Sequence, residues 1–426
     1  MAADILYENM TKLGLYTWKE QIKNTKNNPK LTHKLDVLDY ELRVNNKTVD
    51  CAPSPAWFAP RDNDDQLNCS FSYTNLKVKK VPRFSLAYNP QLAKENEDFV
   101  FIDIDKFYNP DYETIKIPCL NTFKNRFKLK HGLIFLGFEA QTKKWQKFYP
   151  HCKGLIIYDF NKDTHDIVIL KEANTLPIFF INGTIGEEII KNIEDTRIDY
   201  RLEQQYNTSV ISYNVIGQIN GTDPTKTVII DCLYDSWWCQ GTADSAIGMA
   251  MVLGIAKYFK DHNITPKYNI KFIGFGGEEY GFTAGSRYYE DTHKDENIIY
   301  VIDLNQLGFK QEKPHLTLNV ISNKREFLRE IWKIVERTDY EERVGGASDI
   351  APLFMRNGAP SDDSPFAKNR PSCKTVCFLK DGPWVLHHRD GLNHTEGDTM
   401  QYFDWNDVSA TGEMVWNVTE YLAVDP

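Results

Sequence analysis

Residues 228–248, VIIDCLYDSWWCQGTADSAIG, are the stretch that decides the fold. The first five are apolar or β-branched apart from one Asp, and they predict a buried strand over 228–232. A polar and aromatic loop follows. Asp244 then opens a segment rich in small residues, which predicts a helix over 245–259. A strand followed closely by a helix is the unit from which parallel α/β sheets are built.

The same alternation continues towards the end of the chain. We therefore expect an α/β fold with a mostly parallel open sheet and helices on both faces. Ligands of such sheets gather at the carboxyl ends of the strands. The further predicted strands are 270–275, 298–304 and 375–379, and the further predicted helices are 282–290, 324–337 and 405–421.

The first half of the chain has a different pattern. Residues 3–26 carry apolar side chains at roughly helical spacing and predict an amphipathic helix. Short apolar runs bounded by turn residues then predict a small mixed β/α domain, with strands over 99–104, 132–136, 154–158 and 177–181 and a helix over 140–149. We divide the chain into an N-terminal helical segment over 1–40 that packs on the larger domain, a smaller domain over 41–205 and a larger domain over 206–426.

Composition and charge exclude some classes of function. The chain has 426 residues, of which 42% are hydrophobic and 26% charged, and its formal net charge is −9. These values are typical of globular domains. A nucleic-acid surface needs clustered Lys and Arg, and the short basic group at 77–80 is interpreted as a solvated face. We expect no nucleic-acid partner.

The sequence predicts no membrane span, because it has no run of 18 apolar residues. The first ten residues include acidic side chains and do not read as a signal peptide. The eight cysteines form no CxxC pair, which favours a reducing compartment. We expect a cytoplasmic protein, with an extracellular location as the alternative if a leader has been removed. The sequence leaves homodimerisation open.

Four polar features follow the predicted strands or lie near the chain's end. They are residues 234–236, Asp244, the adjacent pair Glu278 and Glu279, and residues 393–399, NHTEGDT. Two adjacent carboxylates are costly unless positive charge matches them, and carboxylates with imidazole are good zinc ligands. Each feature alone has an ordinary reading, such as a helix cap or a solvated turn. Together, at one edge of a sheet, they indicate a metal site.

These residues resemble the zinc-dependent M28 peptidase family. The matching pieces are DCLYDSWW, GTADSAIGMAMVLGIAKYF, IKFIGFGGEEYGFTAGSRYY, IDLNQLG, SDDSPF and NHTEGDT, which lie in the family's order and spacing over roughly the last 200 residues. The preceding segment, with GLIFLGF, CKGLIIYDF and LPIFFING, is similar to the protease-associated domain of this family. The resemblance implies a zinc-exopeptidase fold for the larger domain and a protease-associated domain for the smaller one.

The resemblance also implies residue roles. Asp244 would be the aspartate that bridges two metals in the family, Glu279 and His394 would complete the first metal site, and Glu278 would be the general base. Asp235 occupies the position that steadies a histidine ligand from behind in the family. We include it in the catalytic group, with a structural role in loop hydrogen bonds as the alternative. Trp237 and Trp238 either line a substrate cleft or cover an apolar surface.

The second metal site of the family is degenerate here. Its histidine ligand is replaced by Leu233, which has no donor atom, and its late aspartate by Asn305, a poorer ligand. Asp303, His387 and His388 are candidates for compensation. Asp303 lies two residues before Asn305 and deeper in the strand. We expect one zinc per chain, or none.

Three functions fit this pattern. The first is a metallo-exopeptidase, an aminopeptidase in particular, that hydrolyses peptides with one zinc-activated water. The second is a single-zinc acyl transferase similar to glutaminyl cyclases, whose Asp-Ser-Ala resembles residues 244–246. The third is a non-catalytic relative that uses the scaffold to bind peptides or another protein. Loss of the second site favours the third function or a one-metal enzyme, and the intact Glu278 and Glu279 pair favours chemistry.

Overall fold

The computed structural model describes residues 2–53, 56–58, 69–80, 90–104, 148–158, 170–172, 176–236, 239–281, 283–308, 317–344, 349–359, 361–381 and 398–424. The chain divides into two compact units, each described here by itself. The first comprises Met1–Thr32, Ser209–Pro383 and Asp390–Pro426, and the second comprises His33–Thr208 and Trp384–Arg389. The strand predicted over 132–136 and most of the helix predicted over 140–149 lie outside the described residues.

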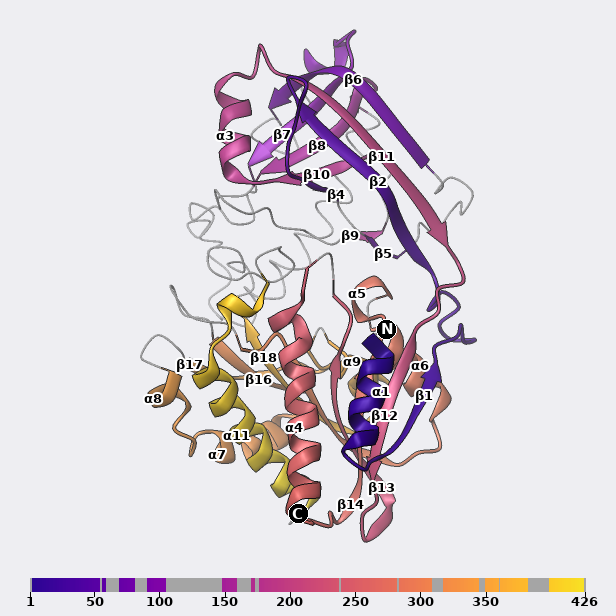
Figure 1. Cartoon of the computed structure of the whole chain (residues 1–426), viewed down its shortest axis with the longest axis vertical. Helices are drawn as coiled ribbons and strands as arrows, with labels where there is room; N and C mark the ends of the chain where they lie inside the picture. Colours follow the sequence, from indigo (N-terminus) through magenta and orange to yellow (C-terminus); the bar gives the residue numbers. More distant parts are fainter. Residues whose placement is uncertain are drawn as a thin grey trace. The chain divides into compact units, whose positions relative to one another are not determined.

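The first unit is built on an eight-stranded sheet (Figure 1). Its four central strands are parallel, and they include all four strands that the sequence predicts for the larger domain. In spatial order the strands are β1 (Tyr16–Gln21), β12 (Tyr213–Ile219), β14 (Tyr268–Phe275), β13 (Asp223–Leu233), β15 (Ile298–Asn305), β18 (Lys374–Asp381), β16 (Thr317–Ser322) and β17 (Asp349–Phe354).

The sheet is mixed and mostly parallel, as the sequence predicts, with three antiparallel pairs beside the parallel ones. Strands β1 and β12, β12 and β14, and β16 and β18 are antiparallel pairs. One cause is the connection from β12 to β13, which has only residues 220–222. A link this short cannot hold a crossover helix, so β13 must run opposite to β12. The parallel core therefore has antiparallel flanks.

Helices cover both faces of this sheet, as predicted. Apolar residues of β13 alternate between the faces, with Val228 and Ile230 towards one core and Ile229 towards the other. Figure 1 shows α4 and α11 running side by side on the first face. That face carries α1 (Ala2–Lys12), α4 (Ile247–Asp261), α7 (Arg325–Val335) and α11 (Trp405–Ala423), and the second carries α6 (Ala284–Thr292) and α9 (Ser364–Asn369).

Shorter helices lie in the connections of this unit. They are a π-helical turn η5 (Thr242–Ala246), α5 (Glu278–Gly281), α8 (Tyr340–Val344) and η6 (Met400–Tyr402). In the described part of the chain, no helix is both long enough and apolar enough to cross a bilayer.

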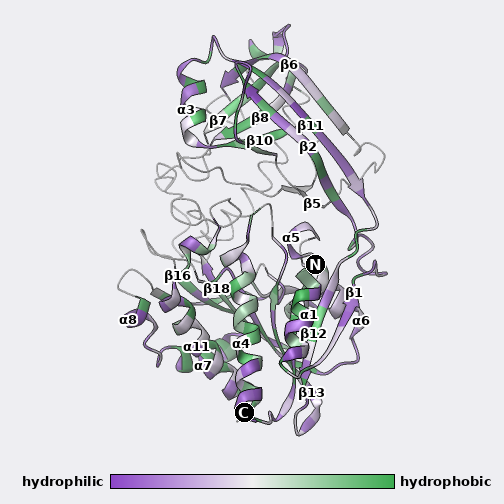
Figure 2. Ribbon diagram, viewed as in Figure 1, coloured by the Kyte–Doolittle hydropathy of each residue, from purple (hydrophilic) through white to green (hydrophobic). Residues whose placement is uncertain are grey.

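The second unit has its own eight-stranded sheet. The neighbours β6, β7, β8 and β10 are parallel, and the remaining pairs are antiparallel. Figure 2 colours β7, β8 and β10 largely green, in keeping with their buried apolar residues. The sheet order is β3 (Lys47–Thr48), β2 (Lys34–Val44), β11 (Arg197–Asn207), β6 (Cys69–Lys80), β7 (Phe99–Ile104), β8 (Cys152–Tyr158), β10 (Ile178–Ile181) and β4 (Ala52–Pro53).

The strands predicted over 99–104, 154–158 and 177–181 correspond to β7, β8 and β10. Helix α3 (Gly183–Lys191) begins after β10, where the Asn182 side chain accepts a hydrogen bond from Ile185 N at 3.0 Å and caps the helix. The remaining elements of this unit are the strand pair β5 (Ala56–Phe58) and β9 (Leu170–Glu172) and the turn η2 (Leu92–Lys94).

The helix predicted over 3–26 is wrong beyond residue 12. Helix α1 ends at Lys12, and Gly14 then adopts φ +73°, a left-handed conformation that suits glycine. Tyr16–Gln21 forms β1, which pairs with β12 at the edge of the sheet. Leu6 and Met10 of α1 are buried in the core beneath. Long-range pairing with β12 therefore prevails over the local helical spacing.

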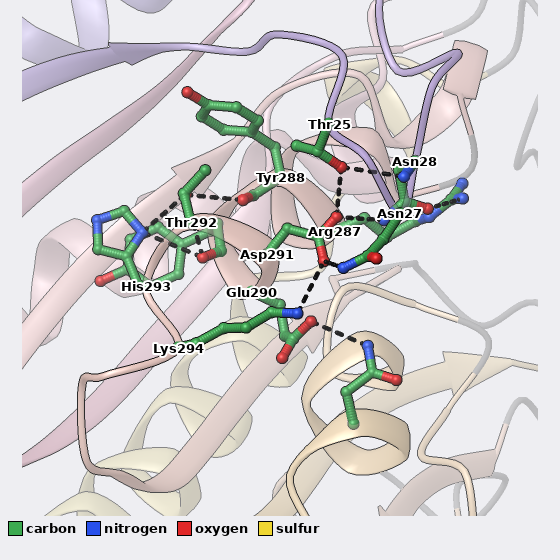
Figure 3. A network of polar contacts seen from close by, with 12 residues as sticks. Thr25, Asn27, Asn28, Arg287, Tyr288, Glu290, Asp291, Thr292, His293 and Lys294 are labelled. Carbon is green, nitrogen blue, oxygen red and sulfur yellow. Dashed lines mark hydrogen bonds and ion pairs between the residues drawn. The ribbon is translucent and has the colours of Figure 1, made fainter.

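A polar network holds residues 25–28 against α6 (Figure 3). The carboxylate of Asp291 accepts hydrogen bonds from Thr25 Oγ1 at 2.5 Å and from the side-chain amides of Asn27 and Asn28, each at 2.7 Å. Burial raises the pKa of Asp291, but the hydrogen bonds from these three side chains lower it more, so the pKa lies below its ordinary value. The network ties the N-terminal segment to the unit that contains α6.

Replacing Asp291 with Ala should weaken this attachment. We expect the free energy of unfolding at pH 7 to fall by about 1–3 kcal/mol, because three donors lose a charged acceptor. The pKa of Asp291 is lower in the folded state than in the unfolded state. Its contribution to the free energy of unfolding is therefore present above the unfolded-state pKa and is lost as the pH falls through the folded-state pKa. The difference from wild type should therefore shrink below about pH 4. Urea denaturation against pH measures it, with exposed Asp295→Ala as the control. Equal stability of wild type and Asp291→Ala at pH 7 would contradict this role.

Candidate active site

Three parallel strands of the first unit deliver polar residues to one edge of the sheet. Strand β13 ends at Leu233, β14 at Phe275 and β15 at Asn305, and each lies beside a parallel neighbour. The loops that follow carry Asp235 and Asp244, the Glu278 and Glu279 pair, and Gln306. The sequence expectation that these segments share an edge is met for all of these described residues.

Asp235 holds the loop after β14. Its Oδ1 accepts hydrogen bonds from Gly277 N at 3.0 Å and Glu278 N at 3.1 Å, and its Oδ2 accepts one from Glu279 N at 3.2 Å. Gly277 has φ +76°, which a side chain would strain. Burial raises the pKa of Asp235 to about 6, although the backbone hydrogen bonds oppose the rise. Asp235 therefore fixes the backbone from which both glutamates project.

The two glutamates are buried, with exposed fractions of 6% for Glu278 and 3% for Glu279. Burial raises the pKa of Glu278 well above its ordinary value, and the negative charges of Glu279, Asp362, Asp244 and Asp235 raise it further. Carboxylates gathered in this way need a matching positive charge. A divalent cation would meet this need, and Asp244 and Glu279 supply carboxylates of the kind that bind one.

Asp244 is held from two directions. The carboxylate of Asp398 accepts hydrogen bonds from Ala243 N at 2.8 Å and Asp244 N at 3.1 Å. The Ser245 hydroxyl lies 3.0 Å from Asp244 Oδ1, and Gln306 Nε2 donates to Asp244 Oδ2 at 3.3 Å. Asp244 is 3% exposed. These contacts leave the carboxylate little freedom to turn.

Part of the predicted site cannot be placed. His394, His387, His388, Trp237 and Trp238 lie outside the described residues. Within the described ranges, no three His, Cys, Asp or Glu side chains are arranged to hold a metal. The metal set proposed from the sequence therefore needs His394 in addition to the carboxylates.

The second metal position does not fit a cation. Leu233 is fully buried among apolar side chains of the first face. Asn305 Oδ1 lies 3.0 Å from the Ser245 hydroxyl, and Asn305 Nδ2 donates to Ser361 Oγ at 2.9 Å. Both ends of the amide are thus in hydrogen bonds. Neither residue offers a charged donor atom to a metal.

Asp303 lies deeper, as predicted for a residue two positions before Asn305. It is the register partner of Asp231 on β13, and both residues are fully buried. No described group donates a hydrogen bond of good geometry to any of their four oxygens. Burial raises the pKa of Asp303 to about 6, and burial together with the charge of Asp303 raises that of Asp231 further. Two such carboxyls avoid a double charge by keeping a proton.

This pair gives a prediction about stability. The pKa values of Asp231 and Asp303 are raised in the folded state. The contribution of this pair to the free energy of unfolding is therefore present at acid pH and is lost as the pH rises from about 4 through 6 and above. Asp231→Asn removes the charge conflict but keeps a hydrogen-bonding group. We expect it to stabilise the protein at pH 7, by on the order of 1–3 kcal/mol for about two pKa units, and less at pH 4–5. Thermal unfolding across this pH range measures the gain, with Asp295→Asn as the control, and a loss of stability at pH 7 would contradict the shared proton.

A cavity of about 290 Å³ adjoins the loop between β13 and α4. Helix α1 forms one wall and α4 another, so the N-terminal helix contributes to the surroundings of Asp235 and Ser245. Its described lining residues are Ala2, Ile5, Leu6, Asn9, Tyr234, Asp235, Ser236, Gln240, Gly241, Ser245, Ala246, Met249, Ala250 and Leu253.

Sequence reasoning missed two residues of this site. Asp398 lies inside the quoted motif NHTEGDT, so its place beside His394 was a signal for it. Gln306 follows Asn305 directly, but no local pattern predicts that its side chain contacts Asp244. Both contacts join residues more than 60 positions apart.

Buried carboxylates thus gather at the carboxyl ends of the parallel strands, the edge at which α/β sheets bind their ligands. Residues 214–419, just under half of the chain, match the sequence model of Peptidase family M28, so this segment is identified as an M28 peptidase segment. The resemblance inferred from the motifs is thus confirmed.

Known relatives agree with this assignment. Carboxypeptidase Q of Bos taurus is 22% identical over 218 residues, which are 50% of this chain and 42% of that protein. Aminopeptidase YwaD of Bacillus subtilis (strain 168) is 23% identical over 262 residues, 59% of this chain and 54% of that protein. The chain thus spans about half of the length of these relatives.

Solved structures share the fold. A zinc aminopeptidase from Bacillus subtilis matches 99% of this chain and 88% of its own, with a TM-score of 0.65 and 16% identity. A peptidase M28 precursor from Shewanella amazonensis matches 98% of this chain and 86% of its own, with a TM-score of 0.66 and 14% identity. At these identities the likeness concerns the fold alone.

Proposed function

We propose that this chain is a metallo-exopeptidase, an aminopeptidase in particular, that hydrolyses peptides with one zinc ion. The observation that carries the proposal is the burial of Glu278 and Glu279 beside Asp244, in the segment that matches the M28 family. An inactive site would have no physical need for two adjacent buried carboxylates. The B. subtilis relatives, named as aminopeptidases, support the reaction class.

Asp244 and Glu279, with His394 from outside the described residues, would hold the metal. When bound, zinc would polarise the scissile carbonyl and make a water molecule acidic near neutral pH. Glu278 would take the proton from that water and pass it to the leaving amine. Asp235 would keep Glu278 in place through the amides of the loop.

Replacing Glu278 or Glu279 with glutamine should show which residue is the general base and which is the metal ligand. Glu278→Gln should keep its zinc but lose turnover by about 10²–10⁴-fold, because proton transfer is lost. Glu279→Gln should lose the zinc itself. Metal analysis of protein purified without added zinc, together with hydrolysis of aminoacyl-anilides, measures both effects. Unchanged turnover in Glu278→Gln would make the assignment of the base wrong.

Two other functions keep support from particular observations. The degenerate second site favours a non-catalytic peptide- or protein-binding relative. The sequence Asp244-Ser-Ala246 favours a single-zinc acyl transferase similar to glutaminyl cyclases. Absence of zinc even after loading would leave only the first of these. Cyclisation of peptides with N-terminal Gln, without hydrolysis of aminoacyl-anilides, would identify the second.

Restoring both missing ligands should rebuild the second site. The double variant Leu233→His with Asn305→Asp supplies an imidazole and a carboxylate beside Asp244. We expect the zinc content to rise from about one towards two per chain. Leu233→Met with Asn305→Gln, which adds no imidazole or carboxylate, is the matched control. If the double variant binds no more zinc than this control, our placement of the second site is mistaken.

A further inference from the structure

The turn that follows β15 is held in a strained conformation. Gln306 has φ +53°, in the left-handed region that non-glycine residues rarely adopt. Gln306 N donates to Ser245 Oγ at 3.2 Å, and Leu307 N donates to Ala243 O at 3.1 Å. Two successive amides of the turn therefore bind the segment that carries Asp244. Strained residues persist where surrounding contacts over-determine them, and they cluster at functional sites.

The same turn is anchored at its far end by a buried charge. Gly308 N donates to Asp407 Oδ2 at 3.0 Å, and Tyr340 donates its hydroxyl to Asp407 Oδ1 at 2.6 Å. Lys380, fully buried like Asp407, pairs with the same carboxylate. A buried ion pair with these extra hydrogen bonds resists displacement, since removing one partner would leave an unpaired charge. The position of the Gln306 backbone is therefore fixed from both sides.

This backbone conformation brings the side chain of Gln306 into contact with Asp244. Gln306 Nε2 reaches Asp244 Oδ2 at 3.3 Å, while Ser245 Oγ lies 3.0 Å from Asp244 Oδ1. The Ser245 hydroxyl has a single proton, and Asn305 Oδ1, also 3.0 Å away, competes for it. Gln306 therefore contacts Asp244 through the carboxylate oxygen that Ser245 does not.

We propose that Gln306 is a positioning residue, whose amide orients Asp244 for a single cation in place of a second metal. This inference rests on the proposed function. A neutral amide offers a hydrogen bond without a full charge, so Asp244 keeps its negative charge for the one zinc. Outer groups of this kind fix the direction of a ligand and raise metal affinity. Asn305 reinforces the arrangement, because its hydrogen bonds to Ser245 and Ser361 occupy the adjoining space.

The test measures the binding of zinc alone by competition with a chromophoric chelator, using metal-stripped full chain. Gln306→Met keeps the length of the side chain and removes the donor. We expect the dissociation constant for zinc to rise about 10–100-fold, with little change in the melting temperature of the metal-free protein. Gln21→Met, on the exposed edge strand β1, is the matched control and should bind zinc as wild type does.

A second variant separates the amide from the backbone. Asparagine tolerates a positive φ, but in Gln306→Asn the amide is one methylene too short to reach Asp244. Gln306→Asn should therefore bind zinc as weakly as Gln306→Met. Wild-type affinity in Gln306→Asn would show that backbone conformation is the cause, and the proposal would be wrong. Wild-type affinity in Gln306→Met would equally overturn it.

The outcomes also distinguish this inference from the proposed function. If wild type binds one zinc and turns over peptides while both variants bind zinc normally, only the role of Gln306 fails. If wild type binds no zinc, both fail together. If wild type binds two zinc ions per chain, the single-cation arrangement is wrong even though the peptidase assignment stands.

Discussion

The constraint on which the rest of the site depends is negative charge concentrated out of water. Glu278, Glu279, Asp244 and Asp362 lie at one buried edge, and burial, followed by their mutual repulsion, raises the pKa of Glu278. Other buried or partly buried carboxylates of this unit are stabilised by backbone amides. Asp235 accepts three of them, Asp398 accepts two, and Asp407 accepts that of Gly308. Carboxylates in this unit therefore fix the backbone of loops, in addition to serving as candidate metal ligands.

The layout of the larger domain could be predicted because its strands are almost entirely apolar. Apart from Asp231 and Lys271, residues 228–232 and 270–275 are apolar runs, the pattern expected of a buried parallel strand. Strand β1 has exposed positions and a half-buried face, so the sequence alone gave a helix there. Its partner β12 lies about 200 positions away, and no local pattern records that pairing.

The candidate site likewise contains residues that could be predicted from the sequence and residues that could not. Asp244, Glu278 and Glu279 carry chemistry in their residue types and follow predicted strands, so they could be proposed from the sequence. Gln306 and Asp398 act through contacts that only folding creates. The pairing of Asp231 with Asp303 depends on the register of two parallel strands, which periodicity does not determine. A low identity of 16% with a structure of the same fold shows how few positions the fold itself prescribes.

The pairing of β1 with β12 affects the order in which the first unit can fold during synthesis. Helix α1 and β1 are synthesised well before β12, which begins only at Tyr213, after residues 33–208 of the second unit. At about 5–20 residues per second, this interval lasts roughly 10–40 s. During that time the apolar face of α1, with Leu6 and Met10, has no sheet to cover. The edge of the first unit's sheet can therefore be completed only after β12 has been synthesised.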